Sequence, residues 1–194
     1  MIACGKGMAR RAALIKSLRA FATIALVLCA SVSLAADQES KAYKSGAYEF
    51  QLAPAPAWVD VHDVAREWDA AAPGASGARW RNWLWDSQVD RRSGTRERYF
   101  DRAYEAVSPE LVQDAGKHQI WFSPDYQRLI LHRVELRRDG TWHDRLLPNA
   151  ITLARRESEF ENDMSNGIVS ALIVLDDVRI GDVVRVSYTI SGDN

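Results

Sequence analysis

Cysteine is nearly absent from this sequence, and its start contains no acidic residue. Both cysteines, Cys4 and Cys29, lie within the first 29 of 194 residues. Whatever folds after that point can form no internal disulfide and has no thiolate to act as nucleophile or metal ligand. The first 36 residues hold five basic residues and no acidic one. Thiol chemistry is thus excluded from residues 36–194, and the N-terminal region stands apart in charge.

The N-terminal region has the pattern of a secretory signal peptide. Basic residues precede the apolar run AFATIALVLCASVSL at residues 20–34, and Ser33 and Ala35 supply the small side chains of a cleavage site. A membrane-spanning helix needs about 20 apolar residues, so the run is short for one. The pattern predicts a signal-peptide helix over residues 1–35 and cleavage between Ala35 and Ala36. The protein is then periplasmic or secreted and leaves the membrane after cleavage; a retained signal anchor is the alternative.

The charge of the remaining residues argues against nucleic acid as a partner. Residues 36–194 keep 20 of the 25 basic residues and all 26 acidic ones, which gives a formal net charge of −6. Affinity for nucleic acid comes largely from neutralising phosphates, which an acidic domain does poorly. A chain of this length is typical of one domain. We expect a flexible lead-in over residues 36–45 and a single domain over residues 46–194.

Short segments with alternating polar and apolar residues predict an all-β fold. About nine strands at short spacing, with one or two short helices, favour an antiparallel β-sandwich. A helix of about two turns is expected from Ser108 to Gly116, with Pro109 in its first turn. Residues 58–61 are expected to form an additional edge strand. The nine main strands are expected at residues 48–52, 80–89, 96–107, 119–122, 126–138, 142–147, 150–156, 168–175 and 182–190.

A β-hairpin is expected around Asp139 and Gly140. Asp-Gly between two strand-like segments favours a two-residue turn, because both residues tolerate a positive φ. This turn places His143 opposite a residue near Leu136. Trp142 is expected to be largely buried on the hairpin.

Three tryptophans in one predicted strand are the candidate binding surface. Regular alternation would put Trp83 and Trp85 on one face of the strand and Leu84 on the other, with Trp80 at its start. Packing in the sandwich core is the ordinary role for such a face. The alternative is a surface on which the flat indole rings stack sugars or hold a partner peptide.

No pattern in residues 36–194 predicts catalysis, a metal site or a cofactor. The histidines lack the close spacing typical of zinc ligands, and the strand–Gly-x-Ser-x-Gly–helix signature of many hydrolases is missing. Asp176, Asp177 and Asp182 are typical of turns between strands, with a calcium site as the alternative. We therefore predict no catalytic, metal or cofactor-binding residue. The four histidines are His62, His118, His132 and His143.

Several motifs together resemble a known domain family. The segments are YEF at 48–50, APAPAWV at 53–59, FSPDYQRL at 122–129, DVRIGDVV at 177–184 and YTISG at 188–192. In this order they resemble the uncharacterised N-terminal domain that precedes transglutaminase-like domains in exported bacterial proteins. The resemblance spans residues 46–194. It implies an all-β sandwich without catalytic residues of its own, because the chemistry belongs to the domain that follows.

The sequence thus predicts a non-catalytic exported accessory or interaction module. Its partner would be a transglutaminase-like domain or another exported protein. The alternative is a carbohydrate or cell-wall binding module that uses the strand from Trp80 to Trp85. The sequence stops at Asn194, directly after the last predicted strand, and a free-standing module and a fragment of a longer gene both fit this ending.

The predicted cleavage site gives the first test. Edman sequencing of the exported protein should begin at Ala36, whether Met1 or Met8 is the start codon used, because both starts keep the same cleavage site. Exported material that begins at Met1 or Met8, or that stays in the membrane fraction, would contradict signal-peptide cleavage.

Overall fold

A computed structural model describes residues 40–64, 79–155 and 167–193 of the chain. The chain divides into two units, Met1–Ala35 and Ala36–Asn194, and every described residue belongs to the second. The predicted signal-peptide helix and its cleavage site at Ala35 and Ala36 lie outside the described residues. Among the described residues, no helix is long and apolar enough to cross a membrane.

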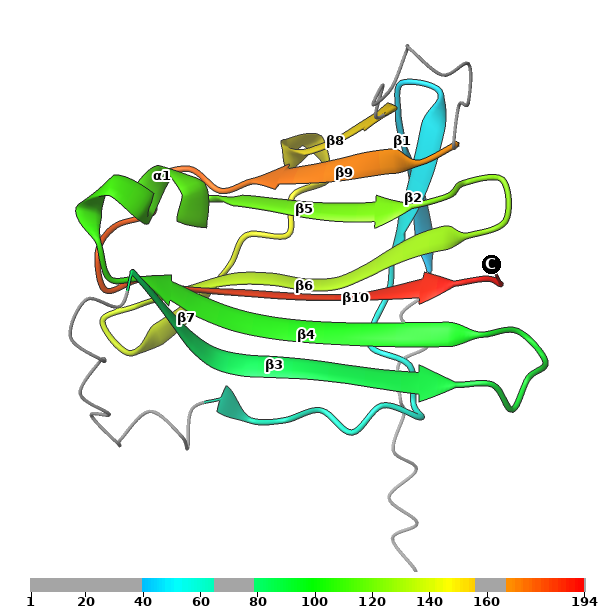
Figure 1. Ribbon diagram of the computed structural model, residues 1–194, viewed down its shortest axis with the longest axis horizontal. Coiled ribbons are helices and arrows are strands. Elements are labelled where there is room, and N and C mark those ends of the chain that lie inside the picture. Colours follow the sequence, from blue (N-terminus) through cyan, green and yellow to red (C-terminus); the bar gives the residue numbers. More distant parts are fainter. Residues whose placement is uncertain (1–39, 65–78, 156–166, 194) are drawn as a thin grey trace, which may run out of the picture. The chain divides into compact units, whose positions relative to one another are not determined.

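Two β-sheets form the domain, as the sequence predicts (Figure 1). The large sheet has the strand order β1-β2-β6-β10-β4-β3, and β7 adds to β6. Every strand pair in this sheet is antiparallel except the pair of β2 and β6, which is parallel. The bounds are β1 Lys41–Ser45, β2 Tyr48–Leu52, β3 Trp80–Asp90, β4 Glu97–Ala106, β6 Arg128–Arg138, β7 Thr141–Asp144 and β10 Val183–Ser191.

The small sheet has only three strands, in the order β5-β9-β8, all antiparallel. Among the described residues, one short α-helix, α1, lies between β4 and β5, with a 3-10 turn directly before it and another before β8. The bounds are β5 Lys117–Phe122, β8 Ile151–Arg155, β9 Val169–Val174, α1 Val112–Ala115, and 3-10 turns at Pro109–Leu111 and Pro148–Ala150.

Two segments differ from the sequence-based expectation. Residues 41–45 form β1 instead of a flexible lead-in. Only one large apolar side chain marks this strand: Tyr43 stacks on Phe50 of β2, with ring centroids 5.7 Å apart. Residues 58–61 form no strand. The backbone N–H of Asp60 donates instead to the side chain of Gln88 on β3.

The helix between β4 and β5 begins and ends where predicted but for different reasons. Pro109 opens a 3-10 turn, and the side chain of Ser108 does not cap the backbone. Gly116 ends the helix without a positive φ. A Cβ atom at Gly116 would lie 2.7 Å from the carbonyl oxygen of Leu175, so close packing on the segment after β9 requires glycine here.

The main hydrophobic core lies between the two sheets. Alternate residues of each strand point into it, which is the pattern expected of a sandwich. β10 is unusual because every residue from Val183 to Thr189 is buried, so both faces of this central strand are covered. The fully buried core side chains include Phe50, Ile120, Leu129, Leu131, Leu136, Val169 and Ile173.

The hairpin around Asp139 and Gly140 is confirmed. Both residues have positive φ, 51° and 80°. His143 pairs with Leu136 as expected. Trp142 is only partly buried, however, because it packs on a small cluster at the outer face of the large sheet and not in the core between the sheets.

The positive φ of Gly140 gives a stability test. Gly140→Val should lower the free energy of unfolding by about 1–3 kcal/mol, because a β-branched residue is strained at positive φ. No other group lies within 4 Å of the position that a Cβ atom would occupy, so the loss would come from the backbone alone. Gly140→Asn is the matched control, since asparagine tolerates this conformation. Equal urea midpoints for the valine and asparagine variants would contradict the assignment.

Candidate functional site

A β-bulge in β3 decides where the three tryptophans lie. The pairing with β4 shifts between Asn82 and Leu84, which leaves Trp83 as the extra residue. A bulge of this kind places two successive side chains on one face of the strand. Trp83 and Leu84 therefore pack together on the outer face of the large sheet. The expectation that Trp83 and Trp85 share a face is wrong because regular alternation is broken here.

Trp83 has a structural role at this outer face. Its indole Nε1–H donates to Oε2 of Glu105 at 3.0 Å. The guanidinium of Arg81 lies over the indole ring and also reaches Glu105, at 3.1 Å. These contacts hold Trp83 half-buried beside the cluster of Val64, Ala103 and Val183. Trp83 is thus not available as part of an open binding surface.

Trp85 lies on the opposite, inner face and is the most exposed of the three, at 67%. It is paired with Arg102 of β4, whose guanidinium carbon lies 3.7 Å from the centre of the indole ring. Such a cation–π contact leaves one face of the ring covered. Trp80 is 37% exposed and packs edge-on against Tyr104.

Beside Trp85, β4 carries a stripe of alternating arginine and aromatic side chains on its inner face. Arg98 and Arg102 flank Phe100 at every second position, which is the repeat of one strand face. The guanidinium of Arg98 lies over the Phe100 ring, at 5.4 Å from its centre. Phe100 in turn stacks on Tyr188 of β10, at 5.0 Å. The aromatic rings thus hold the two cations at the surface of the sheet.

A groove of about 400 Å³ runs between this stripe and the small sheet. We call it the Arg98–Arg102 groove. Its floor is the inner face of β4, and one wall is β5 with Trp121, which is 52% exposed. Tyr126, also 52% exposed, contributes from the loop after β5. None of the described residues that line it is acidic. This groove brings together arginine, tryptophan and tyrosine at an open surface.

The two arginines of the groove have no carboxylate partner in the part of the chain that the structure describes. Within the described residues, neither Arg98 nor Arg102 forms an ion pair, whereas Arg81, Arg138 and Arg185 each do. The Nε atom of Arg98 is buried without a hydrogen-bond partner among the described residues. Because the domain as a whole is acidic, a pair of uncompensated cations in one groove is a local feature that favours an anionic ligand.

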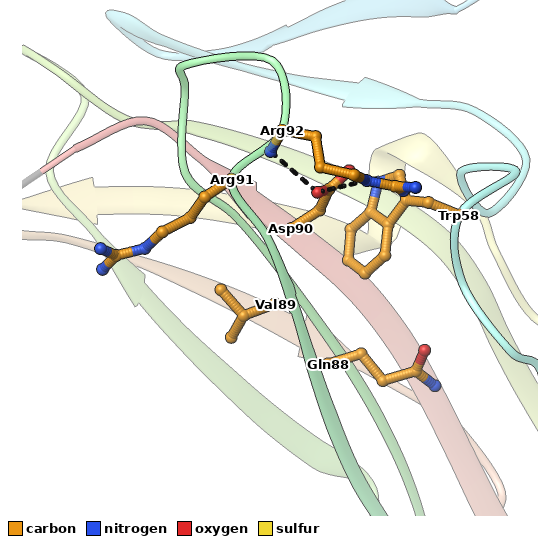
Figure 2. A pocket seen from close by; sticks show the side chains of 6 residues that line it. All are labelled: Trp58, Gln88, Val89, Asp90, Arg91 and Arg92. Atoms are coloured by element: carbon orange, nitrogen blue, oxygen red, sulfur yellow. Dashed lines mark hydrogen bonds and ion pairs between the residues drawn. The ribbon is translucent and has the colours of Figure 1, made fainter.

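A second hollow, of about 680 Å³, lies at the far end of β3 (Figure 2). Trp58 forms one side, and its Nε1–H donates to Oε2 of Glu97 at 2.7 Å. The Arg92 side chain donates to both carboxylate oxygens of Asp90, at 2.8 and 3.0 Å, and this lowers the pKa of Asp90. Asp90 and Arg92 therefore pair with each other, and the Trp58–Glu97 hydrogen bond anchors the segment after β2 to the β3–β4 hairpin.

The outer face of the large sheet carries a buried polar network. Arg185 of β10 makes a bidentate ion pair with Asp101 of β4, at 2.6 and 3.0 Å. A second hydrogen bond runs from Arg185 to the backbone carbonyl of His62, which fixes the segment after β2 on this face. Tyr99 donates to Asp101 at 3.1 Å. Burial, and then the charge of Asp101, raise the pKa of Tyr99 to about 12, so its hydroxyl keeps its proton.

His132 belongs to this network through a second bulge. The pairing of β6 with β10 shifts between Ser187 and Tyr188, and His132 is the additional residue. Its Nδ1 is 2.9 Å from the carbonyl oxygen of Ala53, which can only accept, so Nδ1 carries the hydrogen. Nε2 then accepts from the hydroxyl of Thr189 at 2.8 Å. Burial lowers the pKa of His132, consistent with a neutral ring that links β6, β10 and the segment after β2.

The remaining sequence candidates are dispersed or already paired. Asp177 and Asp182 both bind Arg138, at 3.0 and 2.6 Å, so these carboxylates form an ion-pair cluster at a turn. His62 and His143 are exposed. In the part of the chain that the structure describes, no group of three or more His, Cys, Asp or Glu side chains is arranged to hold a metal ion.

The fold and its surface define a two-sheet β-sandwich module with an arginine- and aromatic-lined groove at one open edge. The chain belongs to the family described as a Domain of Unknown Function with solved structure (DUF3857), whose model matches residues 92–194. The match covers β4 to β10. No curated protein matches the chain.

One solved structure has a similar fold. It is a crystal structure described as that of a "putative protease" from Parabacteroides distasonis, with a TM-score of 0.52 and 17% sequence identity. The match covers 59% of this chain and 23% of that chain. At this identity the likeness shows the fold alone.

His118 gives a test of how the inner face is packed. It lies on β5 between Tyr104 and Tyr188, and burial, followed by the charge of Arg102, lowers its pKa to about 4. The unfolded chain therefore binds more protons than the folded one between about pH 6.5 and pH 4, and stability falls as the pH falls through this window.

The expected loss across this window is on the order of 3 kcal/mol. His118→Phe keeps an aromatic ring but cannot titrate, so its free energy of unfolding should change less between pH 6.5 and pH 4 than that of the wild type. Urea denaturation at several pH values measures both proteins. His132 titrates in each of them and is therefore an internal control. If the free energy of unfolding depends on pH in the same way for both proteins, folding does not lower the pKa of His118 and the packing described here is contradicted.

Proposed function

We propose that the chain is a non-catalytic exported, periplasmic accessory module that binds another protein. One observation carries the proposal: the Arg98–Arg102 groove combines arginine, tryptophan and tyrosine at an open edge of a rigid sandwich. These three residue types are the ones most enriched where protein interfaces gain their binding energy. Exposed Trp85, Trp121 and Tyr126 lie around two cations that have no carboxylate partner among the described residues.

A transglutaminase-like domain is the partner that we propose. The motif resemblance to domains that precede such domains supports this, and so does the solved structure in which a similar sandwich forms 23% of a longer chain. The module itself would have no transglutaminase or thiol-peptidase activity, because no cysteine follows Cys29. Its role would be to position or hold the protein that carries the chemistry.

Carbohydrate binding through the strand from Trp80 to Trp85 is the second candidate function. The 67% exposure of Trp85 favours it. Two contacts weigh against it: Arg102 covers one face of the Trp85 ring, and Trp83 lies on the other side of the sheet. A sugar would have only the remaining face of Trp85 for stacking, without a second coplanar indole beside it.

Titration calorimetry with a separately produced transglutaminase-like domain tests the proposal. The purified protein should bind that domain, and Trp85→Ala and Trp121→Ala should each weaken binding about tenfold or more, as expected for truncated interface anchors. Ile180→Ala is the matched control, because Ile180 is exposed to the same degree as Trp121, at 51% and 52%, and lies outside the groove.

Two results would overturn protein binding as the function. One is the absence of binding together with a monodisperse monomer in light scattering at high concentration. The other is a tryptophan fluorescence shift on adding cell-wall oligosaccharides that is lost in Trp85→Ala, which would replace protein binding by carbohydrate binding. Transamidase or peptidase turnover by the purified protein would contradict the non-catalytic role.

A further inference from the structure

The edge of β5 that faces the groove is free of a strand partner. β5 lies at the end of the small sheet and pairs with β9 alone among the strands that the structure describes. An unpaired edge presents a regular row of backbone N–H and C=O groups, which is a template for one more strand. The groove lining includes side chains from both faces of β5, such as Trp121 and Phe122, so the groove follows this edge.

Below that edge, the inner face of the large sheet continues beyond β5, and no described strand or helix covers it there. Trp85 and Val89 of β3 lie beyond β4 on this face and are 67% and 52% exposed. Figure 1 shows β5 and β4 running in opposite directions, and residues of both strands line the groove. A strand added beside β5 would therefore lie over β4, along the stripe of Arg98, Phe100 and Arg102.

The spacing of the two arginines determines where a strand added beside β5 would need acidic residues. Arg98 and Arg102 are four residues apart on one face of β4, about 13 Å at the rise of a β-strand. An added strand has the same rise, so its side chains at positions i and i+4 would face the two guanidinium groups. The residue at position i+2 would lie over Phe100.

We propose that the Arg98–Arg102 groove binds an extended acidic peptide as a fourth strand of the small sheet, with the pattern acidic–x–apolar–x–acidic. The two carboxylates pair with Arg98 and Arg102, the apolar residue contacts Phe100, and the peptide backbone pairs with β5. Main-chain hydrogen bonds supply affinity and the alternate side chains supply specificity in this mode of recognition. The inference rests on the proposed function and names the segment of the partner that is recognised.

The free strand edge is what favours a peptide over an anionic glycan. A glycan could place carboxylates on the two arginines, but it offers no repeating N–H and C=O groups to match β5. Arg98 and Arg102 by themselves could bind either ligand. The two arginines together with the unpaired edge of β5 fit a peptide. Binding of an anionic glycan is therefore an outcome that the test must separate.

Fluorescence anisotropy with a labelled peptide of sequence GSETVTESG tests the proposal. The peptide should bind the purified protein, and Arg98→Gln and Arg102→Gln should each weaken it about tenfold or more, as expected for loss of a close charge pair. Arg145→Gln is the matched control, because Arg145 is exposed and lies outside the groove. It makes the same change in net charge and should alter the affinity less than twofold.

Two control peptides test the spacing and the backbone pairing. GSETVETSG has the same composition but places its second acidic residue at i+3, which points it to the other face of a strand, so it should bind about tenfold more weakly. GSETVTESG carrying N-methyl groups at alternate residues on its β5-facing edge should also lose affinity, because it cannot complete the ladder. Hydrogen exchange of the amides in Lys117–Phe122 should slow when the unmodified peptide is added.

The outcomes separate this inference from the proposed function. Equal binding of both acidic peptides, unchanged affinity in both arginine variants, or exchange protection confined to other strands would overturn the strand-addition mode. Binding of a polygalacturonate oligomer in place of the peptide would assign the groove to glycans. If the transglutaminase-like domain binds but neither arginine variant affects it, the function stands and this inference fails. If the peptide binds as described and the domain does not, the groove assignment stands and the proposed partner fails.

Discussion

The two sheets of this sandwich differ in width, and the open surface of the domain follows from that difference. Three strands pack on a face to which β2, β6, β10, β4 and β3 all contribute. Because neighbouring strands are about 4.8 Å apart, a three-stranded sheet cannot cover all of it. The small sheet covers the inner side of β6 and β10. The inner-face residues Arg98, Phe100 and Arg102 of β4 are only partly buried, and Trp85 and Val89 of β3 are exposed. The Arg98–Arg102 groove lies where this coverage ends.

The outer face of the large sheet is covered by a different kind of structure. On that face, the segment after β2 lies against the large sheet as irregular chain, and its backbone carbonyl groups face polar side chains of the sheet. Arg185 and His132 reach these carbonyls at His62 and Ala53. The ion pair between Arg185 and Asp101 is buried, and removing one partner from such a pair is far more costly than the net contribution of the pair to stability. This polar network therefore specifies how the segment is placed on the sheet.

Two bulges show why the candidate site was only partly visible in the sequence. Alternation correctly located β3, yet one extra residue at Trp83 placed Trp85 on the face opposite Trp83 and on the same face as Trp80. A bulge changes hydrogen-bond register without changing composition, so strand periodicity alone does not reveal it. The arginine stripe did have a signal: in RERYFDRAY at 96–104, Arg98 and Arg102 share one face of a strand with Phe100. Its meaning depended on how far the small sheet extends over the large one, and the local sequence does not encode that extent.

The sequence by itself determined the features that depend on composition and on residues adjacent in the chain. The Asp139–Gly140 turn, the all-β class, the position of most strands and the lack of cysteine after Cys29 follow from local conformational preference and composition. Tertiary structure alone decided which faces are covered. Trp142, expected to be largely buried, is only partly buried at the outer face. Lys41–Ser45, which looks like a polar lead-in, is a strand because it pairs with the edge of β2 and Tyr43 stacks on Phe50. Whether a side chain is exposed depends on which other segments pack on it, and those segments are far away in the sequence.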